Sequence, residues 1–412
     1  MLIYTLNMLM KAGIFCLDFK SRHIDINNLS DKTSKAAIFE SRSFQKTLLD
    51  SVSHASHMDK RIKTNTTDLS MLVETNPEAA VTTQSSCSQL RSPVGLLSNP
   101  LSFHNRHRPA PVMRRILRDY PEVHQFPVSN REEIRAAVEH LKTIGTRLII
   151  ANGGDGTVQG VITEIWRVWE GDNLPQIAVM PGGRTNVISY DLNGRIRPRE
   201  VLRRILSSYC QNCPEKIRER RLLKINYDDH AAELGFLISG AGLAAGIEEC
   251  WSFRHRLRKM GLFGGLGTAT WVLLRLLTTP AGKPLLPPRP AKITIDGKTL
   301  PDEYQQLLMI TVNERFPVGV QPFWPQQKHD REPNLKVTVV RSGAKGLWWR
   351  TLPLAKGWGR FLPSESGYYS GCAQKIEVRT EQNFHLDGEI RAVNNLVTLN
   401  IELGPKMEFL TV

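Results

Sequence analysis

A glycine-rich loop that carries one carboxylate is the stretch of this sequence best suited to chemistry. It consists of Asn152, Gly153, Gly154, Asp155, Gly156 and Thr157. The apolar run 148–151 predicts a buried strand before the loop, and the apolar spacing from 158 to 169 predicts a helix after it. Glycines let a phosphate approach the backbone, and the N–H groups at a helix start face the anion. An acidic side chain in such a loop would repel phosphate unless it binds a cation or takes part in a proton transfer. Asp155 therefore indicates phosphoryl transfer.

The same loop is also compatible with a tight strand-to-helix turn that binds nothing. Its glycines alone do not separate the two interpretations, whereas Asp155 and Thr157 favour the phosphate site. The spacing is not the dinucleotide fingerprint, because Gly-x-Gly-x-x-Gly is missing, and no Gly-Lys-Ser/Thr supports a Walker loop.

Two further loops contain residues of chemical interest. The segment Pro181-Gly182-Gly183-Arg184-Thr185-Asn186 follows another apolar run, 177–180. Near the C-terminus, His385-Leu386-Asp387-Gly388-Glu389 is a predicted turn with two carboxylates, followed by a predicted strand at 396–403. Asp-Gly between strands is the usual sequence of a hairpin turn, so this third loop alone is a weak signal for catalysis.

The elements that must position these loops fall into two patterns. From Pro93 to about Leu222, predicted strands (94–97, 124–128, 148–151, 177–180) alternate with predicted helices (109–120, and 132–143 capped by Ser129 or Asn130). This alternation predicts a doubly wound, mostly parallel α/β sheet, which binds ligands at the carboxyl ends of its strands. Short alternating runs follow (234–239, 291–295, 307–312, 335–340, 375–379), and they predict an antiparallel, sandwich-like β-rich domain.

Four segments result from this division of the chain. Residues 1–92 show no sustained periodicity and are predicted to be a disordered extension or a spurious one, with Met58 or Met71 as alternative starts. Residues 93–222 form the predicted α/β domain and residues 223–394 the β-rich domain. A final strand within 395–412 is predicted to return to the first domain.

The charge of the chain favours an anionic partner. Its 412 residues carry a net charge of +14, of which 11 basic minus 9 acidic residues place +2 on 1–92 and +12 on the rest. A nucleotide or a phosphate-bearing lipid surface is expected, and nucleic acid is not, because no nucleic-acid-binding motif is present. Six cysteines do not make a disulfide framework in a chain this long, which favours a cytoplasmic setting. No run reaches the ~20 apolar residues of a membrane span.

The three loops, in this order, resemble those of the diacylglycerol kinase catalytic family, which includes bacterial soluble lipid kinases and sphingosine kinases. The residues that carry the resemblance are Gly153-Gly154-Asp155-Gly156-Thr157, Pro181-x-Gly183-x-x-Asn186 and Leu386-Asp387-Gly388-Glu389, together with Asn99-Pro100 and Ser239-Gly240-Ala241-Gly242. The first motif alone is shared with NAD kinases and phosphofructokinases. The resemblance covers roughly residues 93–412.

This resemblance implies an ATP-dependent, Mg²⁺-assisted lipid kinase with its nucleotide in the cleft. The implied nucleotide-binding residues are Asn99, Asn152, Gly153, Gly154, Asp155, Gly156, Thr157, Gly183, Arg184, Thr185 and Asn186. Asp387 or Glu389 is the implied base that accepts the hydroxyl proton. Asp155 is the rival base, as its counterpart is in sphingosine kinases; otherwise it organises metal and phosphates.

The sequence departs from the family pattern at several positions. Arg184 replaces a common Thr, Val187 a common Asp and Gly160 a frequent Glu. The metal-site Asp-Asp-Gly corresponds to Arg331-Glu332-Pro333, where only Glu332 could ligate, and the glycine lid is reduced to Pro317-Val318-Gly319. Arg184 could substitute by donating a fork of hydrogen bonds to phosphate. These departures indicate a divergent subfamily or a weakened enzyme.

The expected partner is a lipid hydroxyl at a membrane surface, with no particular lipid identified. The basic run Arg254–Lys259 beside the apolar stretch 260–274 fits peripheral contact with anionic lipid, or else a solvated face of a buried helix. A homodimer is compatible with the sequence. The alternative functions are a soluble-substrate kinase of the NAD-kinase type, for which Asn313-Glu314 could serve, and a nucleotide- or lipid-binding homologue that has lost catalysis.

Overall fold

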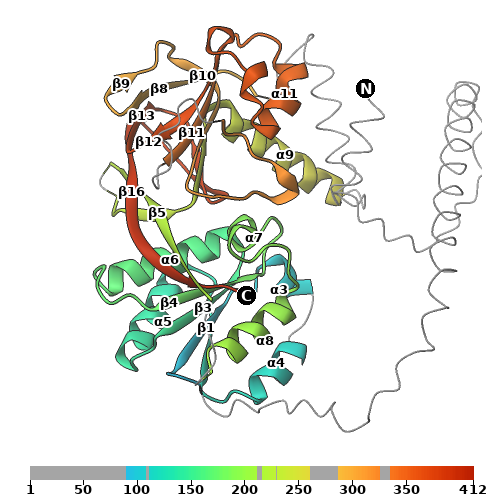
Figure 1. Cartoon of the computed structure of the whole chain (residues 1–412), viewed down its shortest axis with the longest axis vertical. Coiled ribbons are helices and arrows are strands. Elements are labelled where there is room, and N and C mark those ends of the chain that lie inside the picture. Colours follow the sequence, from blue (N-terminus) through green and yellow to red (C-terminus); the bar gives the residue numbers. More distant parts are fainter. Residues whose placement is uncertain (1–89, 108–110, 211–215, 229, 260–285, 325–334) are drawn as a thin grey trace, which may run out of the picture. The chain divides into compact units, whose positions relative to one another are not determined.

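A computed structural model describes residues 90–107, 111–210, 216–228, 230–259, 286–324 and 335–412 (Figure 1). The predicted extension lies outside the described residues except at its end. There Leu90 forms a bridge with Cys210, and the Arg91 N–H donates to the Tyr209 carbonyl at 3.3 Å. Glu332 and the apolar stretch 260–274 also lie outside the described residues.

The first domain is a parallel sheet with helices on both faces. Its strands lie in the order β2 (Val123–Pro127), β1 (Val94–Ser98), β3 (Leu148–Gly153) and β4 (Gln176–Pro181), and neighbours pair in parallel. The helices are α3 (Phe103–His107), α4 (Pro111–Arg118), α5 (Arg131–Thr143), α6 (Asp155–Val168), α7 (Val187–Asn193) and α8 (Pro198–Ser208). Successive side chains of a strand point to opposite faces. Ile149 and Val179 accordingly pack with α5 and α6, and Ile150 and Ala178 with α4 and α8.

This arrangement confirms the predicted doubly wound sheet and sharpens two of its elements. Asn130 is the helix cap: its side chain accepts from the Glu133 N–H at 2.8 Å, and the Glu133 carboxylate accepts from the Ser129 N–H at 2.6 Å. This pair resembles a capping box, with the returning bond made to the N–H of the residue before the cap. The segment after Asn99-Pro100 forms the short helix α3, which the sequence pattern did not predict.

The second domain is antiparallel and β-rich, as predicted. Its strands are β6 (Glu233–Gly235), β7 (Leu237–Gly240), β8 (Arg289–Ile295), β9 (Lys298–Thr299), β10 (Tyr304–Thr311), β11 (Leu335–Arg341), β12 (Tyr368–Ala373), β13 (Lys375–Thr380), β14 (Phe384–Leu386) and β15 (Glu389–Arg391). Its described residues also form helices α9 (Ala241–Lys259) and α11 (Leu347–Lys356) and the 3-10 turns η2 (Pro317–Gly319), η3 (Gly359–Phe361) and η4 (Ser364–Ser366). Among the described helices, none combines the length and the apolar character needed to cross a bilayer.

Two long strands connect the domains, as Figure 1 shows. β5 (Ile217–Tyr227) and β16 (Val397–Leu410) pair antiparallel along most of their length. β16 starts beside β13 and ends beside β4, where Phe409 pairs in parallel with Ile177. The two sheets are therefore continuous, and one hydrophobic core extends from α5 and α6 into the second domain.

Candidate active site

The two glycine loops of the first domain pack backbone against backbone. β3 and β4 are neighbouring parallel strands, so the loops that follow them leave the sheet side by side. A Cβ atom added to Gly182 would lie 2.8 Å from the Gly153 Cα, and one added to Gly183 would lie 2.6 Å from the Gly154 Cα. The Gly182 N–H donates to the Gly153 carbonyl at 2.9 Å. Only glycine permits this approach.

Asp155 ties the second loop to the first. It is the first residue of α6, and its carboxylate accepts from the Thr185 hydroxyl and from the Ile188 N–H, both at 3.0 Å. Burial raises the pKa of Asp155, and these hydrogen bonds oppose the shift. Asn186 closes the second loop with φ of 49°: its side chain accepts from the Gly183 N–H at 2.7 Å and donates to the Gly183 carbonyl at 3.0 Å.

The other polar residues of the predicted nucleotide site hold the strand ends together. The Asn99 side-chain amide donates to the Thr157 hydroxyl at 2.9 Å, and its oxygen accepts from the Leu101 N–H at 2.8 Å. The Asn152 amide donates to the Ser98 hydroxyl at 3.1 Å. Asn99, Asn152 and Thr157 therefore position the loops through contacts with one another and with neighbouring chain.

A pocket of about 270 Å³ opens beside these loops. It is lined by Leu101, Ser102, Phe103, Arg106, Gly154, Gly183 and Arg184. The guanidinium of Arg184 lies over the Phe103 ring, 5.0 Å from its centroid. Two arginines beside two glycine loops make a site that fits an anion, because guanidinium groups donate paired hydrogen bonds to phosphate oxygens. Phe103 and Arg106 were missed by the sequence reasoning; their i, i+3 spacing after the strand-end Asn99 was the available signal.

The predicted hairpin turn Asp387–Gly388 is confirmed, and it faces inward. Positive φ values of 49° and 83° at these residues between β14 and β15 are those of a type I′ turn. The Asp387 carboxylate accepts from the Phe236 and Leu237 N–H groups, both at 2.9 Å, and the residue is only 5% exposed. Burial raises the pKa of Asp387 well above its ordinary value, and the nearby charge of Asp155 adds to the rise.

Glu389 brings this hairpin against the first loop. A Cβ atom added to Gly156 would lie 2.1 Å from a Glu389 carboxylate oxygen, so the glutamate occupies the space that a side chain at 156 would need. The Glu389 side chain is 50% exposed. The structure thus brings together the first loop and the C-terminal turn, which are more than two hundred positions apart in sequence.

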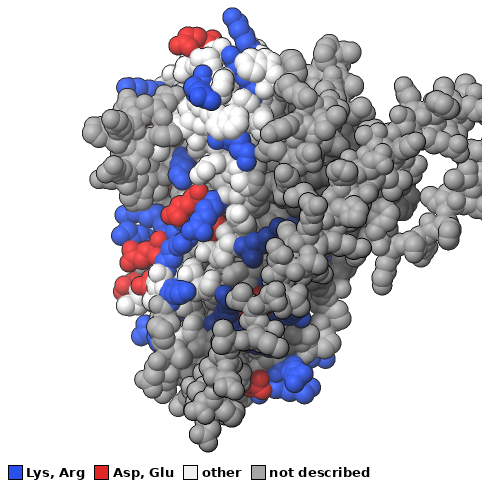
Figure 2. All heavy atoms as spheres, turned by 45° about the vertical axis from the view of Figure 1, so that its right-hand side comes forward, with Lys and Arg blue, Asp and Glu red and all other residues white. Residues whose placement is uncertain are grey.

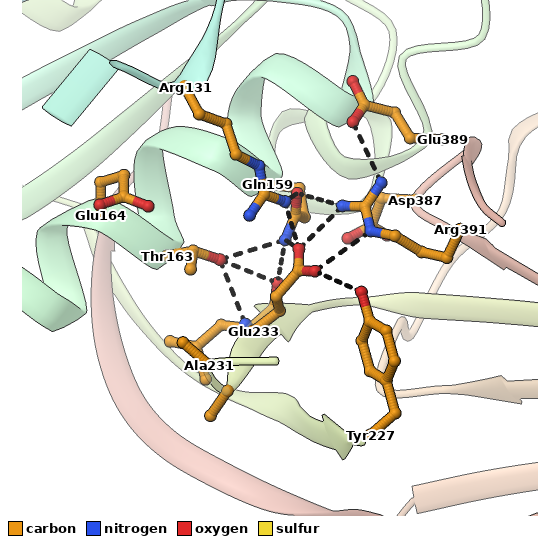
Figure 3. A network of polar contacts seen from close by, with 12 residues as sticks. Arg131, Gln159, Thr163, Glu164, Tyr227, Ala231, Glu233, Asp387, Glu389 and Arg391 are labelled. Carbon is orange, nitrogen blue, oxygen red and sulfur yellow. Dashed lines mark hydrogen bonds and ion pairs between the residues drawn. The ribbon is translucent and has the colours of Figure 1, made fainter. Parts of the chain in front are cut away.

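A network of charged side chains supports the hairpin (Figure 3). Arg391 contacts Glu389 at 3.4 Å and donates to both carboxylate oxygens of Glu233, at 2.8 and 3.2 Å. Arg131 and the Tyr227 hydroxyl also donate to Glu233. Burial alone would raise the pKa of Glu233, but hydrogen bonds from the two arginines lower it to about 2. Sequence reasoning missed this network, since Arg131 and Glu233 stand in different predicted domains.

A second buried ion pair links α7 to the connecting strands. Arg220, in β5, donates to the Asp191 carboxylate at 2.6 Å and also pairs with Glu314 at 2.6 Å. Asp191 further accepts from the Arg315 N–H at 2.8 Å. Burial raises the pKa of Asp191, and the charge of Arg220 opposes the shift. This pair fixes the helix whose first turn binds Asp155.

The described residues contain no group of three or more His, Cys, Asp or Glu side chains that could hold a metal. Mg²⁺ is commonly bound through one or two carboxylates plus substrate phosphates and water. Asp155, beside both glycine loops, is placed to supply such a carboxylate, while Glu332 lies outside the described residues.

Comparison with known proteins supports the resemblance seen in the motifs. Residues 93–213 match the diacylglycerol kinase catalytic domain. Two solved structures of a candidate diacylglycerol kinase from Bacillus anthracis str. Sterne share the fold. One is 19% identical and covers 78% of this chain and 98% of its own at a TM-score of 0.52. The other is 20% identical and covers 79% and 99% at a TM-score of 0.53. A search of curated proteins gives no match.

Proposed function

We propose that this chain is an ATP-dependent kinase of a lipid hydroxyl, because residues 93–213 match the diacylglycerol kinase catalytic domain. The observation that carries the proposal is the contact between the two parts of the site. The first loop provides a phosphate cradle, and the hairpin of the second domain delivers two carboxylates to its edge. A phosphate donor and a hydroxyl acceptor could meet at this edge.

In the proposed reaction the first domain binds the triphosphate. The pocket beside α3 offers the guanidinium groups of Arg106 and Arg184 together with the backbone of Gly154 and Gly183. The start of α6 adds the positive end of its dipole. Asp155 keeps the two loops in register by its bonds to the second loop. Mg²⁺, when bound with the nucleotide, would neutralise phosphate charge.

The second domain supplies the proton acceptor, for which we propose Asp387. Phosphoryl transfer depends mainly on positioning and charge, and a base that takes the hydroxyl proton adds about 10²–10⁴-fold. The raised pKa of Asp387 makes it a better acceptor than an ordinary aspartate. Glu389, half exposed at Gly156, is suited to orient the incoming hydroxyl. The hydroxyl oxygen would attack the terminal phosphorus as the bond to the leaving ADP breaks.

We propose a membrane surface as the place of the reaction, with the protein on its cytoplasmic side. Lipid hydroxyls are presented at that surface, and the basic run Arg254–Lys259 at the end of α9 suits contact with anionic lipid. The side chains of this run lie outside the described residues, so the expectation rests on its sequence.

Labelled ATP incubated with a total lipid extract tests the function directly. We expect label in the organic phase, in a lipid whose mass identifies the acceptor. Label that partitions into water instead would favour a soluble acceptor. Nucleotide binding without turnover on any lipid pool would favour a homologue that has lost catalysis.

A further inference from the structure

The segment from α11 to η3 in the second domain exposes four large apolar side chains. Trp349, Leu352, Trp358 and Phe361, here called the α11 surface, are 41%, 42%, 46% and 38% exposed. Trp349 and Leu352 belong to α11, Phe361 belongs to η3, and Trp358 lies in the turn between them. The rings of Trp358 and Phe361 lie 6.3 Å apart, so the group includes touching members rather than scattered residues.

This exposure is not a failure of the segment to fold. Leu354 of α11 and Leu362 after η3 are 7% and 2% exposed, and they pack in a core cluster with Trp324 and Tyr368. The Trp358 N–H donates to the Pro353 carbonyl at 2.9 Å, which fixes the turn between α11 and η3. The segment is anchored on its inner side and apolar on its outer side. Soluble monomers rarely expose contiguous apolar area without a partner.

Basic side chains predominate in the sequence segment that carries the α11 surface, and one of them, Arg341, pairs with Asp302. Residues 341–363 contain Arg341, Lys345, Arg350, Lys356 and Arg360 and no acidic residue. The Arg350 guanidinium lies 4.5 Å from the Trp349 ring centroid, and that of Arg360 lies 4.6 Å from Phe361. In Figure 2 the upper end of the molecule, where α11 lies in Figure 1, is mainly white and blue with little red.

We propose that the α11 surface docks on an anionic lipid bilayer. Tryptophan favours the boundary between headgroups and acyl chains, where its ring is buried and its N–H stays wet. Arginine and lysine beside it can keep their charges at anionic headgroups while their stems lie in the apolar layer. The cations beside the tryptophans favour a surface that presents many anionic groups, and an anionic bilayer presents them at the depth that tryptophan prefers.

This inference rests on the proposed function, because a lipid kinase needs a surface that contacts the membrane. The α11 surface is a different part of the chain from the Arg254–Lys259 run. Binding to vesicles requires no turnover. A chain that binds vesicles but transfers no phosphate would refute only the kinase. A chain that is an active kinase but binds through another face would refute only the docking surface.

The first test is sedimentation of the full chain with vesicles of phosphatidylcholine, with and without phosphatidylglycerol. We expect binding to the anionic vesicles that weakens with salt. The double variant Trp349→Ala/Trp358→Ala should bind about tenfold or more weakly, because two large side chains no longer enter the bilayer. The control Ile217→Ala/Leu396→Ala removes two side chains that are 43% and 54% exposed at the start of β5 and just before β16, and it should bind as the wild type does.

A charge test separates this surface from the general basicity of the chain. Lys345→Glu/Arg360→Glu should weaken binding at least ~30-fold, at about fivefold for each lost cation. Lys298→Glu/Arg379→Glu makes the same change in net charge at other exposed positions and should have little effect. Equal losses in both pairs, or no loss in the tryptophan variant, would overturn the proposal. So would a dimer in sedimentation velocity that the tryptophan variant dissociates while vesicle binding is unchanged.

Discussion

The second domain contains two Asp-Gly hairpins that are alike locally and differ in their surroundings. Asp387–Gly388 joins β14 to β15, and Asp296–Gly297 joins β8 to β9, with φ values of 49° and 83° in one and 45° and 80° in the other. Both aspartates donate their N–H to a backbone carbonyl at 2.9 Å and accept the N–H of that same residue, Leu237 or Lys375.

The difference between the hairpins is tertiary. Asp296 is exposed, whereas Asp387 is 5% exposed and the charge of Asp155 raises its pKa further. Turn chemistry therefore accounts for both carboxylates being fixed, and burial beside the glycine loop accounts for the raised pKa of one of them. A fixed carboxylate becomes a candidate base only in the second environment.

The largest expected effect is on activity, when the same substitution is made at the aspartate of each hairpin. Asp387→Asn should lower the rate of phosphate transfer by about 10²–10⁴-fold, because the amide cannot accept the hydroxyl proton. Asp296→Asn, the matched change in the exposed hairpin, should leave the rate unchanged. Both are measured as label transferred from ATP to lipid, with circular dichroism to show that the fold is retained. Full activity in Asp387→Asn would remove it as the base.

Removal of the support beneath the Asp387 hairpin should cost stability. Glu233→Gln removes the buried carboxylate that Arg391 and Arg131 share, and we expect a loss of about 3 kcal/mol in urea unfolding. The half-exposed pair Lys224–Glu402 is the control, where Glu402→Gln should cost less than about 1 kcal/mol.

The pH dependence of stability is a second test of the contribution that Glu233 makes to the fold. Its pKa falls from 4.5 to about 2 on folding, so its stabilisation is present above pH 4.5 and is lost as the pH falls toward 2. Glu233→Gln should lose this acid-dependent part of the unfolding curve. A variant that keeps the wild-type slope between these values would show that the arginines do not hold the carboxylate ionised.

The two hairpins also show which features could be predicted from the sequence and which could not. Periodicity predicted the parallel sheet, the antiparallel domain and the Asp387–Gly388 turn, because these depend on local patterns. Asp296–Gly297 has the same turn dipeptide but is followed by Lys298 rather than by a glutamate, so turn propensity does not distinguish the two hairpins and only the motif resemblance did. The missed residues, Glu233 and Phe103 among them, owe their places to contacts between elements far apart in the chain.

The interaction between the two carboxylates should appear in the pH profile of activity. Asp387 must be ionised to accept a proton, so activity is lost as the pH falls through its raised pKa. The charge of Asp155 contributes to that rise. Asp155→Asn should therefore shift the acid limb of kcat/KM to lower pH, even where the rate itself falls. An unshifted limb would contradict the coupling, and complete loss of activity would return Asp155 to the position of base.

The smallest expected effect compares the glycines of the two hairpins. Gly388 and Gly297 both have φ near 80° and open space where a Cβ atom would lie. Alanine at either position should destabilise the fold by about 1 kcal/mol, because L-residues are strained in this conformation. Equal shifts in the urea midpoint would show that the turns are energetically alike. Only Gly388→Ala should also lower the rate of phosphate transfer, since its turn alone carries a carboxylate at the glycine loop. A rate loss of the same size in Gly297→Ala would mean that general loosening of the second domain, rather than the position of Asp387, limits the reaction.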